Sequence, residues 1–199
     1  MPIRFAPAIM SLFGLALAWR ALSDLGGWES GVGRMISIAM LLLGLVTFGS
    51  IVLHQLHKGA LKETIDNPQL RVLPACLTVG LMLLSALLNP HMPEAARVLI
   101  WVAAISHFAY LAWLINGWFR GGLALEMISP VWFIPVVGNI VVPVGAIATG
   151  QVMLAWFGFS IGIVMWLLLL PIVFFRLIHG KPMPQALDRT QMLAGAPPA

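Results

Sequence analysis

Charged residues are scarce in this sequence. Of its 199 residues only 9% are Asp, Glu, Lys or Arg, while 60% are hydrophobic, and a soluble domain ordinarily carries about 25% charged residues. Such a chain cannot give a folded domain a water-compatible surface, so the soluble globular classes are excluded. The mean hydropathy of +0.97 indicates a protein that lies in a lipid bilayer.

Cysteine is almost absent, and acidic residues are absent from the apolar runs. The single cysteine, Cys76, lies within such a run, which excludes an intramolecular disulfide and a cysteine-rich metal site. The acidic residues all fall in loops or at the ends of apolar runs: Asp24, Glu29, Glu63, Asp66, Glu94, Glu126 and Asp188. Because carboxylates within membrane spans usually mark proton relays and cation sites, this distribution argues against a proton pump or a cation channel.

Catalytic signatures are also missing. The sequence holds no nucleophile elbow, phosphate-binding loop or zinc signature, so we expect no enzyme, no cofactor and no metal. The pI near 10 raises the question of a nucleic-acid partner. The Lys and Arg residues are scattered between apolar runs and form no basic cluster, so we expect the lipid bilayer as the partner and no nucleic acid.

Six apolar runs have the length and composition of transmembrane helices, which need about 20 apolar residues. They are Phe5–Trp19, Met35–Leu53, Val72–Leu88, Val98–Phe119, Val131–Ala148 and Val152–Phe175. The predicted fold is an all-α integral membrane protein whose helices form three hairpins, separated by polar connections at 54–71 and 120–130. We expect one transmembrane domain over residues 1–178 and a cytoplasmic tail over 179–199.

The basic residues predict the orientation in the membrane. With the N-terminus inside, the cytoplasmic segments hold Arg4, Lys58, Lys62, Arg71, Arg120, Arg176, Lys181 and Arg189, and the outer segments hold Arg20, Arg34 and Arg97. Cytoplasmic loops of membrane proteins are enriched in Lys and Arg. This split of eight against three predicts that both termini are cytoplasmic, in a cell or plasma membrane.

Proline opens each odd-numbered run, at Pro7, Pro74 and Pro135. A proline in the first helical turn loses little, because its missing N–H has no partner there in any case. An interior proline removes a hydrogen bond and bends the helix. Three prolines at comparable positions favour a shared role as kinks around a pore, with the first-turn role as the alternative.

His107 is the only ionisable residue near the centre of a run. It has no acid or second histidine three or four residues away, so a neutral histidine hydrogen-bonded between helices is favoured over a place in a transport pathway. His54 and His57 have a spacing compatible with metal binding but no third ligand nearby, which favours contact with lipid headgroups.

The fifth run carries the most specific pattern. Its residues Ser129-Pro-Val-Trp-Phe-Ile-Pro-Val-Val-Gly-Asn-Ile-Val-Val-Pro-Val-Gly145 resemble the Pro-x-Trp-Phe-x-Pro-x-Val-Gly signature of the tellurite-resistance/dicarboxylate-transporter family, relatives of the plant slow anion channels. The end of the first run, Leu17-Ala18-Trp19, and the entry to the third run after Asn67-Pro68 are also similar to that family.

The resemblance implies ten helices in five hairpins around a pore, lined by proline-kinked odd-numbered helices and gated by phenylalanine, in a trimer. Residues 183–198 resemble the start of a seventh helix, so we expect this chain to be an N-terminal part of such a protein. Carried over, Pro7, Pro74 and Pro135 are the kinks, and Phe5 and Phe133 are candidate aromatic pore residues. Asn139 is a further pore candidate, and the alternative for Phe133 is an interfacial anchor beside Trp132.

The function that follows is movement of anions, either inorganic ions or C4-dicarboxylates, through a homo-oligomeric pore protein. An anion in such a pore is stabilised by helix N-termini and freed backbone N–H groups, since no basic residue falls in mid-span. The alternative is an accessory membrane subunit that transports nothing itself.

Overall fold

The structure is a computed structural model that describes residues 1–25, 30–57, 59–120 and 128–179. Its elements, with η for 3₁₀-helices, are η1 (Ile3–Phe5), α1 (Ala6–Asp24), α2 (Ser30–Gln55), α3 (Ala60–Asp66), α4 (Ala75–Leu88), α5 (Pro93–Phe119), η3 (Pro130–Trp132), α6 (Phe133–Val137), η4 (Gly138–Val141), α7 (Val142–Ala148) and α8 (Val152–His179). The described residues contain no strand. The all-α prediction is confirmed.

Within the described residues, five helical segments are long and apolar enough to cross a membrane: Ile3–Asp24, Gly31–Gln55, Pro93–Phe119, Pro130–Ala148 and Val152–His179. Helix α4 is a shorter apolar helix of 14 residues, about 21 Å long at 1.5 Å per residue. Hydrogen-bonded turns such as that from Leu73 N–H to the Leu70 carbonyl precede it. These turns lengthen the third segment towards the thickness of a bilayer core.

The helix ends correct several predicted boundaries. Helices α1, α2, α5 and α8 extend beyond the corresponding predicted runs. Polar residues at helix ends continue the helical hydrogen bonding without interrupting it. Arg176 is one example: the sequence placed it outside the sixth run, whereas it lies inside α8 and is 2% exposed. The predicted connection 54–71 also contains a short helix, α3. Of the predicted tail, only His179 lies within the described residues, so the domain boundary stays a prediction.

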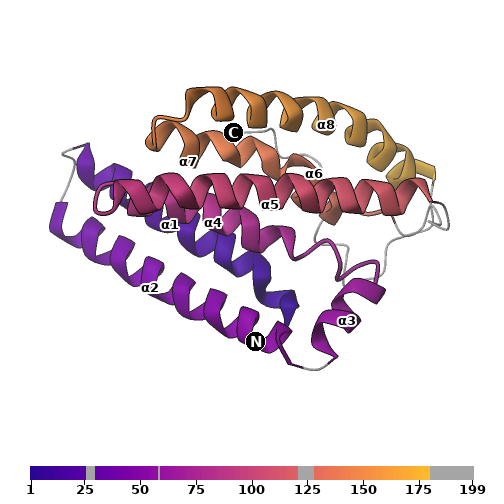
Figure 1. Ribbon diagram of the computed structural model, residues 1–199, viewed down its shortest axis with the longest axis horizontal. Helices are drawn as coiled ribbons and strands as arrows, with labels where there is room; N and C mark the ends of the chain where they lie inside the picture. Colours follow the sequence, from indigo (N-terminus) through magenta and orange to yellow (C-terminus); the bar gives the residue numbers. More distant parts are fainter. Residues whose placement is uncertain (26–29, 58, 121–127, 180–199) are drawn as a thin grey trace.

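The helices form three hairpins side by side, as predicted. Helix α1 packs on α2, α4 packs on α5, and α7 packs on α8. The first member of each hairpin also contacts its neighbour, since α4 contacts α1 on one side and α6, η4 and α7 on the other. In Figure 1 the long helices run roughly parallel to the long axis, with α2 and α8 at opposite edges. The first, third and fifth membrane segments, which contain α1, α4 and α6–η4–α7, therefore lie in a row with α4 at its centre.

The outward faces are apolar, as lipid contact requires. Helix α2 packs mainly against α1, and its exposed residues include Leu42, Val46 and Leu53. Helix α8 likewise exposes Trp156 and Phe175. In water, such a surface would be strongly unfavourable, because apolar area removed from water contributes about 25 cal/mol per Å².

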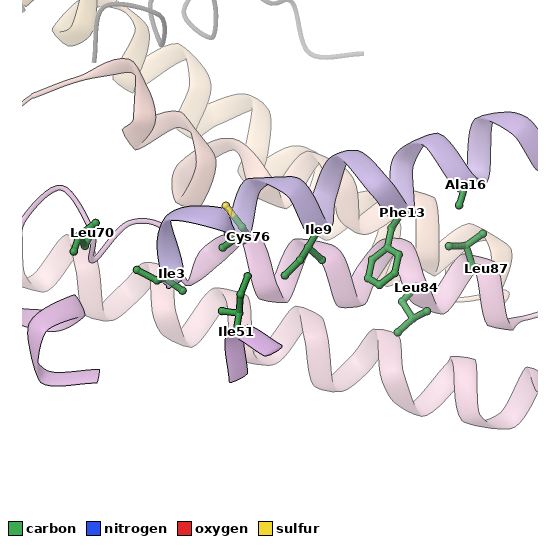
Figure 2. Packing of buried hydrophobic residues seen from close by; sticks show 10 residues of the cluster. Ile3, Ile9, Phe13, Ala16, Ile51, Leu70, Cys76, Leu84 and Leu87 are labelled. Carbon is green, nitrogen blue, oxygen red and sulfur yellow. The ribbon is translucent and has the colours of Figure 1, made fainter. Parts of the chain in front are cut away.

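The core between α1 and α4 is built on a large residue facing a small one. Phe13 and Ile9 of α1 are fully buried and point towards α4, and Figure 2 shows them beside Cys76, Leu84 and Leu87. Gly80 of α4 lies opposite Ile9: a Cβ at this position would lie 2.6 Å from the Ile9 Cγ2 methyl. The missing side chain lets the two backbones approach closely, as is common between membrane helices.

The same device joins α8 to the fifth membrane segment. Gly158 and Gly162 lie four residues apart on α8, facing Val142 and Ile140. A Cβ on Gly162 would lie 2.8 Å from the Ile140 backbone nitrogen. A tight turn connects the two segments, and Gly150 in this turn has φ of 76°, a conformation that glycine adopts without strain.

Candidate functional site

The fifth membrane segment, Pro130–Ala148, changes helix type more often than any other described span, and we call it the broken segment. Its helix type changes from 3₁₀ (η3) to α (α6), back to 3₁₀ (η4) and again to α (α7). Pro135 cannot donate to residue 131, and Pro143 occupies the first turn of α7. Changes of this kind within a span are tolerated where the backbone is buried in protein or lines a polar cavity. Most of the segment is buried.

Asn139 is the buried polar side chain of this segment. It is fully buried in η4, and its Nδ2 donates to the Val136 carbonyl at 3.0 Å. Its Oδ1 accepts no hydrogen bond from any residue that the structure describes. The amide thus satisfies one backbone carbonyl near the α6–η4 transition and keeps an acceptor free.

His107 lies beside the broken segment, on α5, and is also fully buried. Its Nδ1 lies 2.7 Å from Thr78 Oγ1 on α4. Its Nε2 makes no hydrogen bond within the described part of the chain. The predicted histidine hydrogen-bonded between helices is therefore found, and its partner is Thr78.

Gly138 completes this cluster. A Cβ on Gly138 would lie 2.9 Å from His107 Cε1, 3.0 Å from His107 Nε2 and 2.9 Å from Val79 Cγ2. The imidazole therefore packs directly on the backbone of the broken segment. We call Thr78, His107, Pro135, Gly138 and Asn139 the central cluster.

The predicted pore prolines take two kinds of position. Pro7 lies in the first turn of α1 and Pro74 is the N-cap of α4, positions that fit the first-turn alternative, and a role as pore kinks stays a prediction. Pro135 lies within α6, one turn before the change to 3₁₀ geometry. The first, third and fifth membrane segments begin at the same end of the bundle (Figure 1), which places these prolines near one end.

The two predicted aromatic residues differ in burial. Phe5 is 50% exposed at the end of η1. Phe133 is 6% exposed and packs in an apolar cluster with Val72, Leu111 and Val136. The structure thus brings Phe133, Pro135 and Asn139 together on the broken segment and leaves Phe5 and Pro7 on α1.

Thr78 was not singled out from the sequence, and Gly138 appeared only as the last residue of the Pro-x-Trp-Phe-x-Pro-x-Val-Gly signature, without a role of its own. Threonine and glycine are common in membrane helices, and nothing in the spacing between Thr78 and His107 indicates that they meet. The one available signal was the lone mid-span histidine, which needs a hydrogen-bonding partner in an apolar interior.

Ion pairs link charged side chains at helix ends in the described part of the chain. Among the described residues the ion pairs are Arg20 with Asp24 at 3.8 Å and Arg97 with Glu94 at 3.2 Å, both at helix ends. Arg20 also donates to the Leu87 carbonyl at 3.1 Å, which ties the end of α1 to the end of α4.

An apolar cavity of about 480 Å³ lies between the end of α5, the start of the broken segment and α8. Trp118 and Trp132 stack in its wall with ring centroids 4.3 Å apart. The rest of its lining is aliphatic or aromatic, for example Ile115 and Leu169, so its polar groups are the indole N–H groups; that of Trp118 is buried and has no hydrogen-bond partner among the described residues.

These features define a multi-pass all-α membrane protein with an irregular, buried segment beside a polar cluster. Within that class, the chain belongs to the voltage-dependent anion channel family (SLAC1), which matches residues 1–199. The family resemblance seen in the sequence is confirmed, and the general function is that of anion channels and transporters, a class distinct from enzymes. No curated protein matches the chain significantly.

Proposed function

We propose that this protein moves inorganic anions or C4-dicarboxylates across a cell or plasma membrane, along a path beside α1, α4 and the broken segment. The candidate residues along the path are Phe5, Pro7, Pro74, Phe133, Pro135 and Asn139. The protein acts as a homo-oligomer, a trimer by its family resemblance, with both termini in the cytoplasm.

The observation that carries this proposal is the broken segment. A continuous helix satisfies its own backbone and presents no polar groups to an ion. The broken segment changes helix type three times, at η3–α6, α6–η4 and η4–α7, and in this proposal these changes turn backbone N–H groups near Asn139 towards the path. Oriented N–H groups stabilise anions without a buried basic side chain.

The positions of the acidic residues also support an anion as the transported ion. The spans hold no carboxylate near their centres: Asp24 and Glu94 are helix-end residues already paired with arginine. An anion on the proposed path therefore meets no mid-span charge of its own sign. A cation there would find no carboxylate ligand, the usual way that membrane proteins hold one.

The test is anion flux into liposomes that contain the purified protein. Pro135→Ala restores a helical donor in α6 and is expected to change the flux while the protein stays folded. The comparison variants neutralise Arg34, near the start of α2, and Arg120, at the end of α5, and are expected to keep the anion selectivity. Loss of selectivity in either arginine variant, with parent behaviour for Pro135→Ala, would show that fixed charge governs the path. A purified protein without flux would favour the accessory-subunit alternative.

A further inference from the structure

His107 belongs to α5, which lies outside the row formed by α1, α4 and the broken segment. Its side chain nevertheless reaches two members of that row. It contacts α4 through the Thr78 hydroxyl at 2.7 Å and the broken segment through the Gly138 backbone. Helix α5 packs mainly on α4. The imidazole therefore lies where α4, α5 and the broken segment meet.

The hydrogen bonds at this junction fix the ring. Thr78 Oγ1 lies 2.9 Å from the Ala75 carbonyl and 2.7 Å from His107 Nδ1. One hydroxyl proton serves only one of these acceptors at a time. If it goes to the carbonyl, Nδ1–H donates to Thr78; if it goes to Nδ1, Nε2–H is directed away from Thr78. Either arrangement holds the imidazole edge against α4.

The steric contacts fix the broken segment against the ring. Because a Cβ at Gly138 would lie 2.9–3.0 Å from two imidazole atoms, the ring and the backbone of residue 138 are in contact with no space between them. A buried imidazole surrounded on all sides cannot swing away without displacing Val79 or the backbone. The imidazole therefore acts together with direct contacts, such as that of Val79 with Gly138, to set the position of the broken segment relative to α4.

We propose that His107 is a positioning residue: it sets the spacing between α4 and the broken segment, and through that spacing the rate and selectivity of anion movement, without touching the anion. This inference rests on the transport function proposed above. It gives α5, a helix outside the row of α1, α4 and the broken segment, a role in tuning anion movement along that row.

The experiment measures chloride and nitrate flux into liposomes for the parent and for Thr78→Val, Thr78→Ser and Gly138→Ala. Valine has the shape of threonine without its hydroxyl, and serine keeps the hydroxyl. A methyl at 138 pushes directly on the ring. Gly117→Ala is the matched control on α5, because a Cβ there would meet no atom within 4 Å.

The ratio of nitrate to chloride flux separates positioning from loss of folded protein. A smaller folded fraction lowers both fluxes equally and leaves the ratio unchanged, whereas altered spacing changes the ratio. We expect Thr78→Val and Gly138→Ala to shift the ratio at least twofold, and Thr78→Ser and Gly117→Ala to keep it. Protection of the buried Cys76 from maleimide identifies the variants in which the α1–α4 core is intact.

A double variant adds a further check. If the Thr78 hydroxyl acts through the imidazole, Thr78→Val makes no further change in a His107→Leu background, as contacting residues are non-additive. A transporting parent whose ratio is unchanged by Thr78→Val and Gly138→Ala, with Cys76 protected, overturns the positioning role alone. A parent that moves no anion overturns the transport function, and the positioning role falls with it.

Discussion

The contact between Gly80 and Ile9 gives a quantitative test of how the first two hairpins pack. A Cβ on Gly80 would lie 2.6 Å from Ile9 Cγ2, whereas carbon atoms in favourable contact are about 3.5–4.0 Å apart. Gly80→Ala must therefore move α1 and α4 apart by about 1 Å or force Ile9 from its rotamer. Both helices are otherwise closely packed here, since Ile9 and Phe13 are fully buried.

The expected magnitude follows from two opposing effects. Overpacking of this kind costs about 1–3 kcal/mol, and replacing glycine by alanine within a helix gains about 1 kcal/mol. Gly80→Ala is thus expected to lower the free energy of unfolding by about 0–2 kcal/mol. Gly14→Ala on α1 is the matched control, because its Cβ would meet nothing within 4 Å. The difference between the two variants isolates the steric effect, at about 1–3 kcal/mol.

Ile9→Leu provides the partner for a double-mutant cycle. Leucine lacks the branch methyl that faces Gly80 and conserves the volume, so alone it is expected to cost less than about 1.5 kcal/mol. In combination it is expected to relieve much of the Gly80→Ala penalty. The assay is equilibrium unfolding in mixed detergent micelles. Equal stability of Gly80→Ala and Gly14→Ala, or strict additivity with Ile9→Leu, would refute the close approach of α1 and α4 argued here.

Three further outcomes are expected. Gly162→Ala should lower the free energy of unfolding more than Gly80→Ala does, because its Cβ would meet the Ile140 backbone nitrogen at 2.8 Å and a backbone yields less than a side chain. The same unfolding assay compares the two variants, and a smaller loss for Gly162→Ala contradicts this prediction. Ser37→Ala removes a buried hydrogen bond of 2.7 Å to the Ala16 carbonyl and should cost about 0.6–1.7 kcal/mol, with the exposed Ser11→Ala as a control that stays within error. A reporter fused after Ala199 should be active only in the cytoplasm, and activity only outside would reverse the predicted orientation.

The sequence alone determined the class of this protein, because overall composition decides whether the surface of the folded chain is compatible with water or with lipid. With 9% charged residues, only a bilayer accommodates the chain, and the spacing of polar connections was enough to divide it into three hairpins. The signature in the fifth run was specific enough to indicate the family. Helix ends were less well predicted, since residues such as Arg176 continue a helix that hydropathy alone would end.

Only the tertiary structure decided which residues meet. Whether proline bends a helix depends on its place relative to the helix start, and Pro7 and Pro74 proved to lie at that start while Pro135 lies in the broken segment. The partnership of Thr78 with His107 spans 29 residues and depends on how α4 and α5 rotate about their axes, which local sequence does not encode. That rotation is set by close packing over many small contacts, such as those at Gly80 and Gly138, because a membrane interior offers no solvent contrast to orient one apolar face against another.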